Sequence, residues 1–283
     1  MRINEDSVFK NKAYSGELKE NGVIKIPFLL ENELSELNKF YADMHKTGQP
    51  PTMYDGIHMT IWNSDLEYKL KIRDGIKSRI HAAFERNFEN YRAISQQFII
   101  KKQGSETTFP IHQDWSIVDE DYYFSLNIWV PLHDVDEHNG AMWIVKNSHK
   151  IKNKIRGAGI LFPNYFPHRE ALSPYMTSFK MKAGEALIFY HSTIHGSPAN
   201  EKSELRKVIQ TTVLPIAAPL QIYYQKDKNS PLEIHSPEDD FNFKYNKIRE
   251  DSEVIPPTPK YTSLINDYKF EDLDWHRLKA IIN

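Results

Sequence analysis

The sequence contains no cysteine. Disulfide bonds, thiolate zinc sites, iron–sulfur clusters and a cysteine nucleophile are therefore excluded. The absence fits a reducing compartment, and we expect a cytoplasmic protein. Residues 1–6 also lack the apolar stretch that is typical of a signal peptide.

An excess of positive charge is lacking too. The 36 Lys and Arg residues oppose 38 Asp and Glu residues, which gives a formal net charge of −2. This balance indicates neither nucleic acid nor a membrane surface as a partner. No apolar run approaches the roughly 18 residues that span a bilayer. A small-molecule partner is the default, and the oligomeric state stays open.

What is present is an ordinary globular composition, with 283 residues of which 40% are hydrophobic. We expect a single catalytic domain over residues 1–283. Its parts would be a polar arm, N-terminal helices, a β core and a C-terminal extension. They cover residues 1–20, about 32–92, about 94–216 and about 217–283, respectively.

Helical periodicity is confined to the N-terminal third and the end of the chain. Apolar residues at helical spacing predict a helix over about 32–46, with Asn32 as its N-cap. A second helix is expected to begin at a capping box of Ser64 and Glu67 and to continue to about residue 88. A short strand is expected at 21–28, and a docking helix at 274–282.

Short strands dominate the middle of the chain. In residues 123–131, Leu126 and Ile128 lie on one face while Asn127 and Trp129 lie on the other. Many short strands separated by turns predict a sandwich or jelly roll. The fold class is therefore mainly β with flanking helices (α+β). The expected strands cover residues 97–102, 123–131, 141–146, 185–191 and 205–214.

One pair of residues has the spacing of metal ligands. His112 and Asp114 are two residues apart, so in an extended segment both side chains point to the same face. His195 is the candidate third ligand. Two imidazoles and one carboxylate on one face leave open positions, which suits non-haem iron oxygenases. Alone, a His-x-Asp pair is more often a hydrogen-bonded pair at the surface.

The surroundings of His195 strengthen the metal hypothesis. A turn at Gly184 leads into a strand that ends near His195, and the chain then reverses and returns as another strand. Arg206 begins this returning strand, and a fixed cation there suits a bidentate contact with a carboxylate. A rival pair, His168 and Glu170, ranks lower because too few residues separate it from His195 to form the intervening strands.

Over about residues 20–216 the chain resembles the phytanoyl-CoA dioxygenase family, which includes ectoine hydroxylase. One motif departs from the family, which usually has Gly-Ser-His at 147–149, where this chain has Asn147. An Asn tolerates the left-handed conformation as well, so the departure casts little doubt. The motifs that carry the resemblance are residues 22–27, His112-x-Asp114, 127–132, 139–143, 147–149, 184–185, and His195 with Arg206.

This resemblance implies a double-stranded β-helix (jelly roll, cupin-like) core and a dioxygenase that uses Fe(II), 2-oxoglutarate and O2. Iron would be bound by the three candidate ligands. Arg206 and Ser197 would hold the far carboxylate of 2-oxoglutarate, and Trp129 would line that pocket. Asn127, on the same face as Trp129, is a further candidate for the cosubstrate site.

Two other classes of function remain open. The first is a metal-dependent hydrolase or cupin-like enzyme with the same ligands, and the second is a non-catalytic metal-binding relative. Arg206 argues against the hydrolase, which has no need of a fixed cation at that position.

The insertion at residues 150–178 is rich in Pro, Phe and Tyr, and long loops of this kind are often functional. We expect it to lie over the mouth of the barrel and to contact the substrate. Its cations would favour a small polar or acidic metabolite as the compound that is hydroxylated. The contact candidates are Arg156, Phe162, Tyr165, Phe166, His168 and Arg169.

Overall fold

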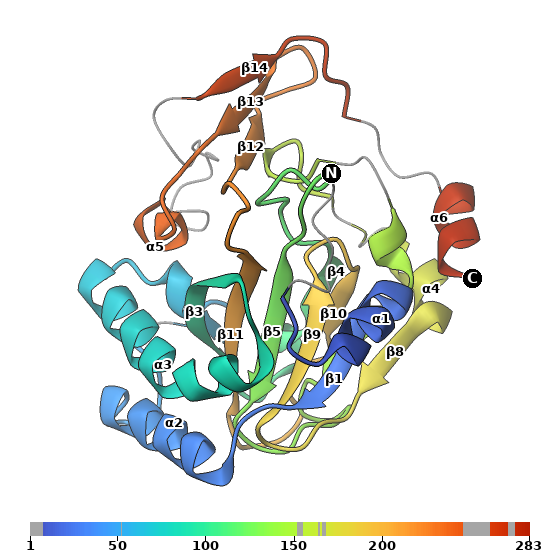
Figure 1. The fold of residues 1–283 in the computed structure, drawn as a ribbon. Helices are drawn as coiled ribbons and strands as arrows, with labels where there is room; N and C mark the ends of the chain where they lie inside the picture. Colours follow the sequence, from blue (N-terminus) through green and yellow to red (C-terminus); the bar gives the residue numbers. More distant parts are fainter. Residues whose placement is uncertain are drawn as a thin grey trace.

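Two antiparallel sheets form the centre of the computed structural model (Figure 1). It describes residues 8–51, 53–151, 155–163, 165, 168–245, 261–270 and 275–283. The larger sheet has the order β1-β9-β5-β11-β3-β2, and the smaller one β4-β10-β6-β8. The large sheet comprises β1 (Val23–Pro27), β2 (Ile57–Met59), β3 (Tyr91–Lys101), β5 (Leu126–Pro131), β9 (Glu185–Tyr190) and β11 (Arg206–Pro215). The small sheet comprises β4 (Phe109–His112), β6 (Met142–Val145), β8 (Met176–Phe179) and β10 (His195–Ser197).

This architecture confirms the predicted jelly roll, mainly β with flanking helices. The large sheet extends beyond the expected β core, because β1 and β2 lie before residue 94. The turn at 147–149 also follows the expectation, since Asn147 adopts the left-handed conformation with φ 65°.

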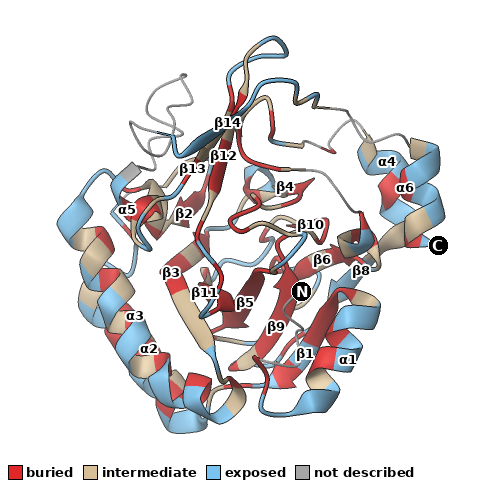
Figure 2. Ribbon diagram, turned by 45° about the horizontal axis from the view of Figure 1, so that its top comes forward, coloured by how far each residue is buried: buried red, intermediate tan, exposed pale blue. Residues whose placement is uncertain are grey.

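The two faces of β5 behave as its alternation predicted. Leu126 and Ile128 pack in the apolar cluster under the helices α2 (Glu31–Met44) and α3 (Leu66–Asn87), which cover the outer face of the large sheet. Trp129 packs on the opposite face, in a cluster with Met142 and Ile144 of the smaller sheet. The site therefore lies between the two sheets, where Figure 2 shows mostly buried strands.

The two N-terminal helices begin close to the predicted positions, but both predicted capping residues were wrong. The backbone N–H of Leu30 donates to the Glu33 carboxylate at 2.8 Å, so α2 begins at Glu31 without a cap from Asn32. Asp65, not Ser64, caps α3 by accepting from the Tyr68 N–H at 3.1 Å. In each case a neighbouring carboxylate satisfies the exposed N–H groups instead.

The expected polar arm is partly a helix. Helix α1 (Lys12–Asn21) is capped by the Asn11 side chain and ends at Gly22, whose φ is 76°. It buries Leu18 near β1. The amphipathic pattern of such a short helix is weak in the sequence, so its stability depends on packing against the rest of the protein. The first seven residues of the expected arm lie outside the described part of the chain.

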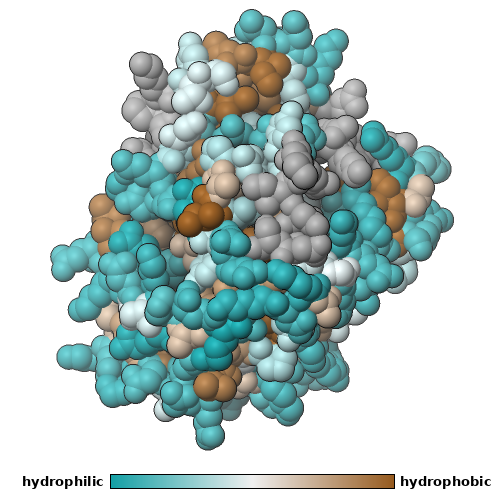
Figure 3. Space-filling model, in the orientation of Figure 1, coloured by the Kyte–Doolittle hydropathy of each residue, from teal (hydrophilic) through white to brown (hydrophobic). Residues whose placement is uncertain are grey.

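The C-terminal extension forms a third sheet together with β7 of the insertion at 150–178, in the order β14-β13-β12-β7. The terminal helix α6 (Trp275–Ile282) docks through buried Leu278 and Ile282, which confirms the predicted docking helix. Strand β14 exposes Leu264 and Ile265. Figure 3 shows a hydrophobic area at the top of the molecule, where Figure 1 places β14. The remaining elements are β7 (Ala158–Gly159), β12 (Ile222–Gln225), β13 (Leu232–His235), β14 (Ser263–Ile265), α4 (Arg169–Leu172) and α5 (Phe241–Tyr245). Among the described residues, no helix combines the length and apolar character that crossing a membrane requires.

Candidate metal and cosubstrate site

The three candidate metal ligands meet between the sheets. His112 ends β4 and His195 begins β10, and the two residues are direct partners in the pairing of these strands. Asp114 follows β4 by two residues. Its two carboxylate oxygens lie 3.6 Å from Nε2 of His112 and 3.6 Å from Nε2 of His195, one oxygen to each ring. The three ligand atoms lie within 4.8 Å of one another.

Both rings are fixed with Nε2 toward the centre of this cluster. Nδ1 of His112 donates to the Pro110 carbonyl at 2.8 Å, and Nδ1 of His195 donates to the Thr193 carbonyl at 2.9 Å. A carbonyl only accepts, so each Nδ1 carries the proton of the neutral ring and each Nε2 presents a lone pair. This tautomer is the one that a metal ligand needs.

The charges of the cluster are also arranged for a cation. Burial opposes ionisation of Asp114, but His195 and His112 together hold its pKa well below the ordinary range. Burial, with a contribution from His112, lowers the pKa of His195 to about 4. An ionised Asp114 carboxylate therefore faces a neutral His195 imidazole, the protonation states that metal binding requires of these two ligands.

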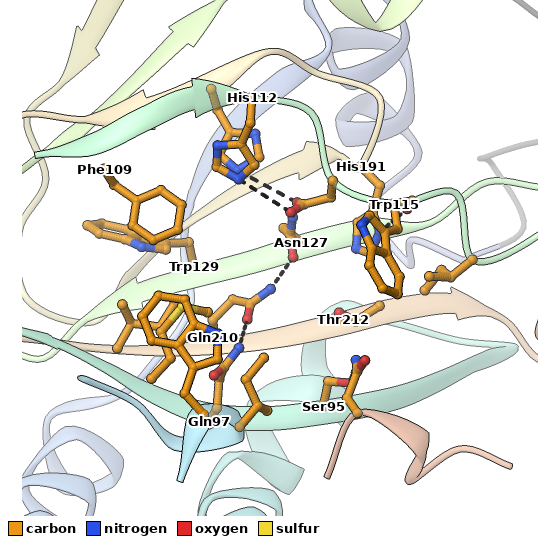
Figure 4. A pocket seen from close by; sticks show the side chains of 18 of the residues that line it. Ser95, Gln97, Phe109, His112, Trp115, Asn127, Trp129, His191, Gln210 and Thr212 are labelled. Carbon is orange, nitrogen blue, oxygen red and sulfur yellow. Dashed lines mark hydrogen bonds and ion pairs between the residues drawn. The ribbon is translucent and has the colours of Figure 1, made fainter. Parts of the chain in front are cut away.

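A chain of side-chain amides fixes the Asp114 carboxylate (Figure 4). The Asn127 amide donates to Oδ2 of Asp114, and the Gln210 amide donates to Oδ1 of Asn127. Gln97 in turn donates to Oε1 of Gln210 at 2.5 Å. The hydrogen bonds of this series of amides all run in one direction, from β3 through β11 to β5. Every side-chain carbonyl in the series except that of Gln97 therefore accepts an N–H. Asn127 thus holds the carboxylate of a candidate metal ligand. It also lines the cavity, and its role in cosubstrate binding stays a prediction.

The backbone of Asp114 is held from behind by a buried arginine. Nε of Arg156 donates to the Asp114 carbonyl at 2.7 Å, and its terminal nitrogens contact Glu120 at 3.0 and 2.5 Å. The Asp114 N–H donates to the His191 carbonyl at 3.0 Å. Both polar groups of the ligand's backbone are therefore satisfied, which limits its freedom to move.

Arg206 lies on the other side of the cluster and is 1% exposed. One of its nitrogens donates to the Gly140 carbonyl at 3.1 Å, and its guanidinium lies 5.5 Å from the Trp129 ring centroid. Burial lowers the pKa of Arg206 to about 9. No ion pair of Arg206 exists among the described residues. Ser197, two residues beyond His195, lines the same cavity.

The cavity has a volume of about 620 Å³ and is mostly apolar. Besides the residues above, its wall contains neutral polar side chains at Ser95, Thr212 and Asn242. Asn242 donates to Oγ of Ser95 at 2.7 Å, and it comes from α5 in the C-terminal extension. The apolar wall includes Met59, Ile61, Trp62, Ile99, Phe109, Trp115, Ile117, Met142, Phe162, Phe189 and Phe241.

The insertion at 150–178 lines this cavity through residues 157–159 and Phe162, but most of the predicted contact candidates lie elsewhere. Phe162 does line it, near His112, but Arg156 is committed to Glu120 and to the Asp114 backbone. His168 stacks on Trp275 of α6, away from the cavity lining. Tyr165 donates to Gln113, and Arg169 begins α4; neither lines the cavity. The candidate Phe166 lies outside the described residues.

Sequence reasoning brought together His112, Asp114, His195, Ser197, Arg206 and Trp129 at one cavity. It missed three residues that the structure adds: Lys101, Gln97 and Gln210. Alternation puts Gln210 on the same face of its strand as Arg206, and only the pairing of β3 with β11 adds the other two. Alternation along 97–101 could have put Gln97 and Lys101 on one face, but it could not say which residues that face meets.

The profile of the phytanoyl-CoA dioxygenase family matches residues 19–208. A phytanoyl-CoA dioxygenase of Arabidopsis thaliana is 32% identical over 117 residues, which are 40% of this chain and 41% of the relative. The chain thus spans about two fifths of the length of the curated relatives that it matches.

Two solved structures share the fold. The α-ketoglutarate-dependent carbocyclase SnoK of nogalamycin biosynthesis has a TM-score of 0.51 and 17% identity, with 72% of this chain and 83% of that chain covered. The epimerase SnoN, solved with Fe3+, α-ketoglutarate and nogalamycin RO, has the same score, identity and coverage. At this identity the likeness concerns the fold alone.

Proposed function

Because the chain belongs to the phytanoyl-CoA dioxygenase family, we propose that it is an Fe(II)- and 2-oxoglutarate-dependent dioxygenase that hydroxylates a small molecule. Enzymes of this family use Fe(II), 2-oxoglutarate and O2. In the balanced reaction, substrate C–H, 2-oxoglutarate and O2 give substrate C–OH, succinate and CO2.

The proposal rests on the conjunction of the three convergent ligands with a buried arginine, Arg206, that has no carboxylate partner in the described part of the chain. His112, Asp114 and His195 would hold iron(II) through two imidazole nitrogens and a carboxylate, on a strand edge that leaves the cavity side open. When bound, iron(II) with 2-oxoglutarate and O2 would supply the oxidant for the reaction.

The chain's own residues would position the metal ligands and the cosubstrate and would exclude bulk water. The Arg206 guanidinium is the group suited to the far carboxylate of 2-oxoglutarate, with Ser197 and Trp129 beside it. Asn127 keeps one Asp114 oxygen engaged and so orients the carboxylate toward the histidines. The aromatic wall around the cavity keeps bulk water from the reacting atoms.

A hydrolase with the same ligands is the weaker candidate. Hydrolysis needs a metal and a base to activate water, but it supplies no carboxylate that would neutralise Arg206. Burying a charge without a partner costs several kcal/mol. This cost is comparable to the whole free energy of unfolding of a protein. A ligand that brings a carboxylate to this position accounts for the arrangement.

The wall of the cavity also limits the substrate. Apart from His residues, its described ionisable groups are Asp114 and Arg206, and both are assigned to the metal and the cosubstrate. An acidic substrate would bury a second carboxylate with no cation to meet it. The expectation of an acidic metabolite therefore loses its support, since Arg156, His168 and Arg169 lie off the cavity. We infer a neutral, largely apolar substrate with hydrogen-bonding groups for Ser95 and Thr212.

The test of the function uses metal and cosubstrate binding together. Purified protein reconstituted with Fe(II) under anaerobic conditions should bind 2-oxoglutarate, and exposure to O2 should release succinate slowly even without substrate. Replacing His112, Asp114 or His195 with Ala should abolish iron binding while leaving the melting temperature within a few degrees. Full succinate release by any of these variants would remove the assignment.

The substrate class is tested with a pair of probes that differ in charge. With the Ni(II) protein saturated with 2-oxoglutarate, calorimetry should show that 2-naphthol binds at least about tenfold more tightly than 2-naphthoate, because only the latter buries a charge. Equal or tighter binding of 2-naphthoate, or binding of neither compound, would contradict the inference.

The cellular context stays a proposal. The absence of cysteine motivates a reducing compartment, and we keep the cytoplasm as the expected location. The partner is a small molecule, as the cavity of about 620 Å³ suits. Equal labelling of soluble and membrane fractions by an antibody to the native protein would argue against this location.

A further inference from the structure

Behind the cavity wall lies a second buried cation, Lys101, at the end of β3. Its side chain is fully buried. Nζ donates to Oγ of Ser197 at 2.7 Å, to the Pro198 carbonyl at 2.7 Å and to the Ser197 carbonyl at 3.4 Å. All three partners of this ammonium are neutral oxygens, and all belong to the segment just after His195.

Lys101 and Arg206 are direct partners in the antiparallel pairing of β3 with β11. Like charges directly opposite each other on adjacent strands destabilise a sheet. Neither cation has a carboxylate partner among the described residues. Gly140 lies close to both side chains, because a Cβ atom built on it would be 3.5 Å from Cδ of Lys101 and 3.6 Å from Cδ of Arg206. Burial, with the neighbouring Arg206, holds the pKa of Lys101 well below its usual range. Two basic side chains therefore share a buried space, and no acidic side chain among the described residues pairs with either of them.

The contact with Ser197 shows how the second charge reaches the cavity. An ammonium only donates, so the Ser197 oxygen is an acceptor in this contact. The serine hydrogen is then free to donate to a ligand, and Ser197 lines the cavity together with Arg206. The ammonium polarises that hydroxyl, because a donor that is itself hydrogen-bonded to a cation is a stronger donor.

We propose that Lys101 is a positioning residue of the cosubstrate site, which acts through Ser197 and makes the site select a 2-oxo acid with a full carboxylate at its far end. The proposal rests on the proposed function, because it assigns the ligand to the Arg206 side of the cavity. A 2-oxo acid whose far end is an amide carries one negative charge less, so it leaves the two cations uncompensated. Lys101 and Arg206 together thus discriminate more strongly by charge than Arg206 alone.

A purely structural role would look different. If Lys101 only tied the segment after His195 to β3, its loss would lower the stability of the protein and weaken every ligand alike. As an unneutralised charge, however, it costs stability in the free protein. Removing it should then leave the unliganded protein no less stable, and should reduce the extra stability that a dianion adds.

The experiment compares Lys101→Met with the wild type, and uses Lys102→Met as the matched control. Lys102 is the next residue, is half exposed, and pairs with Glu106 at 3.4 Å. The probes are 2-oxoglutarate and 2-oxoglutaramate, the analogue in which the far carboxylate is an amide. The dissociation constants are measured by calorimetry on Ni(II) protein, and the melting temperature on metal-free protein.

Lys101→Met should weaken 2-oxoglutarate binding about tenfold to a hundredfold, as expected for a hydrogen-bond network to a charged group, and 2-oxoglutaramate binding about twofold or less. Its metal-free melting temperature should equal or exceed that of the wild type, and Lys102→Met should change none of these values. If the chain does not tolerate Met, Lys101→Gln keeps a donor to Ser197 without the charge and should show the same loss of selectivity.

Equal weakening of both probes together with a lower melting temperature would make Lys101 a structural tie and overturn the proposal, as would unchanged binding of both. If the wild type bound neither probe, the proposed function itself would fail. Binding by the wild type with an unaltered variant would remove only the role of Lys101.

Discussion

The two buried arginines on either side of the metal ligands have opposite surroundings. Arg156 and Arg206 are each 1% exposed. Arg156 contacts the Glu120 carboxylate with two nitrogens and the Asp114 carbonyl with the third. Arg206 donates to one carbonyl, leans over Trp129 and has no acidic partner in the described part of the chain.

The difference separates a scaffold residue from a ligand-binding residue. The charge of a paired guanidinium is neutralised by a carboxylate of the protein, so the group can only hold the backbone that it contacts. An unpaired guanidinium that borders a cavity keeps its charge for a ligand. Burial alone does not distinguish the two residues, whereas the presence or absence of a carboxylate does.

The largest expected effect is on cosubstrate binding by Arg206→Met. Loss of the cation that meets a buried carboxylate should cost about 3–5 kcal/mol of binding free energy. The Michaelis constant for 2-oxoglutarate should rise by orders of magnitude while the melting temperature of the metal-free protein does not fall. Steady-state succinate release at varied 2-oxoglutarate measures the former. An unchanged constant would make Arg206 a scaffold residue like Arg156.

Arg156→Met should show the reverse pattern. It leaves Glu120, whose side chain is 30% exposed, and the Asp114 carbonyl without their partner, so the free energy of unfolding should fall by about 2–3 kcal/mol. Urea unfolding measures the loss, and adding Glu120→Gln should restore part of it. The 2-oxoglutarate affinity of the folded fraction should change less than threefold. A larger change in that affinity would erase the distinction between the two arginines.

A smaller effect is expected from the amide chain that ends on Asp114. Asn127→Ala removes the donor to a metal ligand and should weaken metal affinity about tenfold, and Gln210→Ala should weaken it less because it acts one residue further away. Competition with a chromogenic chelator measures both affinities. A stronger effect of Gln210→Ala than of Asn127→Ala would contradict the order of the chain.

The smallest effect is expected at the insertion. His168→Ala removes a ring that stacks on Trp275 away from the cavity, so the free energy of unfolding should change by about 0.5 kcal/mol or less. The Michaelis constant for 2-oxoglutarate and the affinity for 2-naphthol should both stay the same. A clear loss of 2-naphthol binding would return His168 to the substrate site.

Local periodicity explains what the sequence could predict about this protein. In a strand the side-chain direction alternates with every residue, so the pairs His112 with Asp114 and Asn127 with Trp129 could be placed on shared faces. The left-handed turn at Asn147 and the docking of the terminal helix were likewise predictable from short patterns. The spacing of Arg206 from His195 was read from resemblance to a family, and the structure places both at one cavity.

Cross-strand register decided the rest. Lys101 reads in sequence as one of two lysines that end an apolar strand, and only its pairing with Arg206 makes it a buried second cation. Arg156 reads as a loop cation available to an anion, and only the fold brings Glu120 to it. Alternation fixes which side of its own strand a residue occupies, but its neighbours depend on pairing between segments that can lie more than a hundred residues apart. That pairing is set by packing of the whole fold, so tertiary structure decides which charges are neutralised and which are left for a ligand.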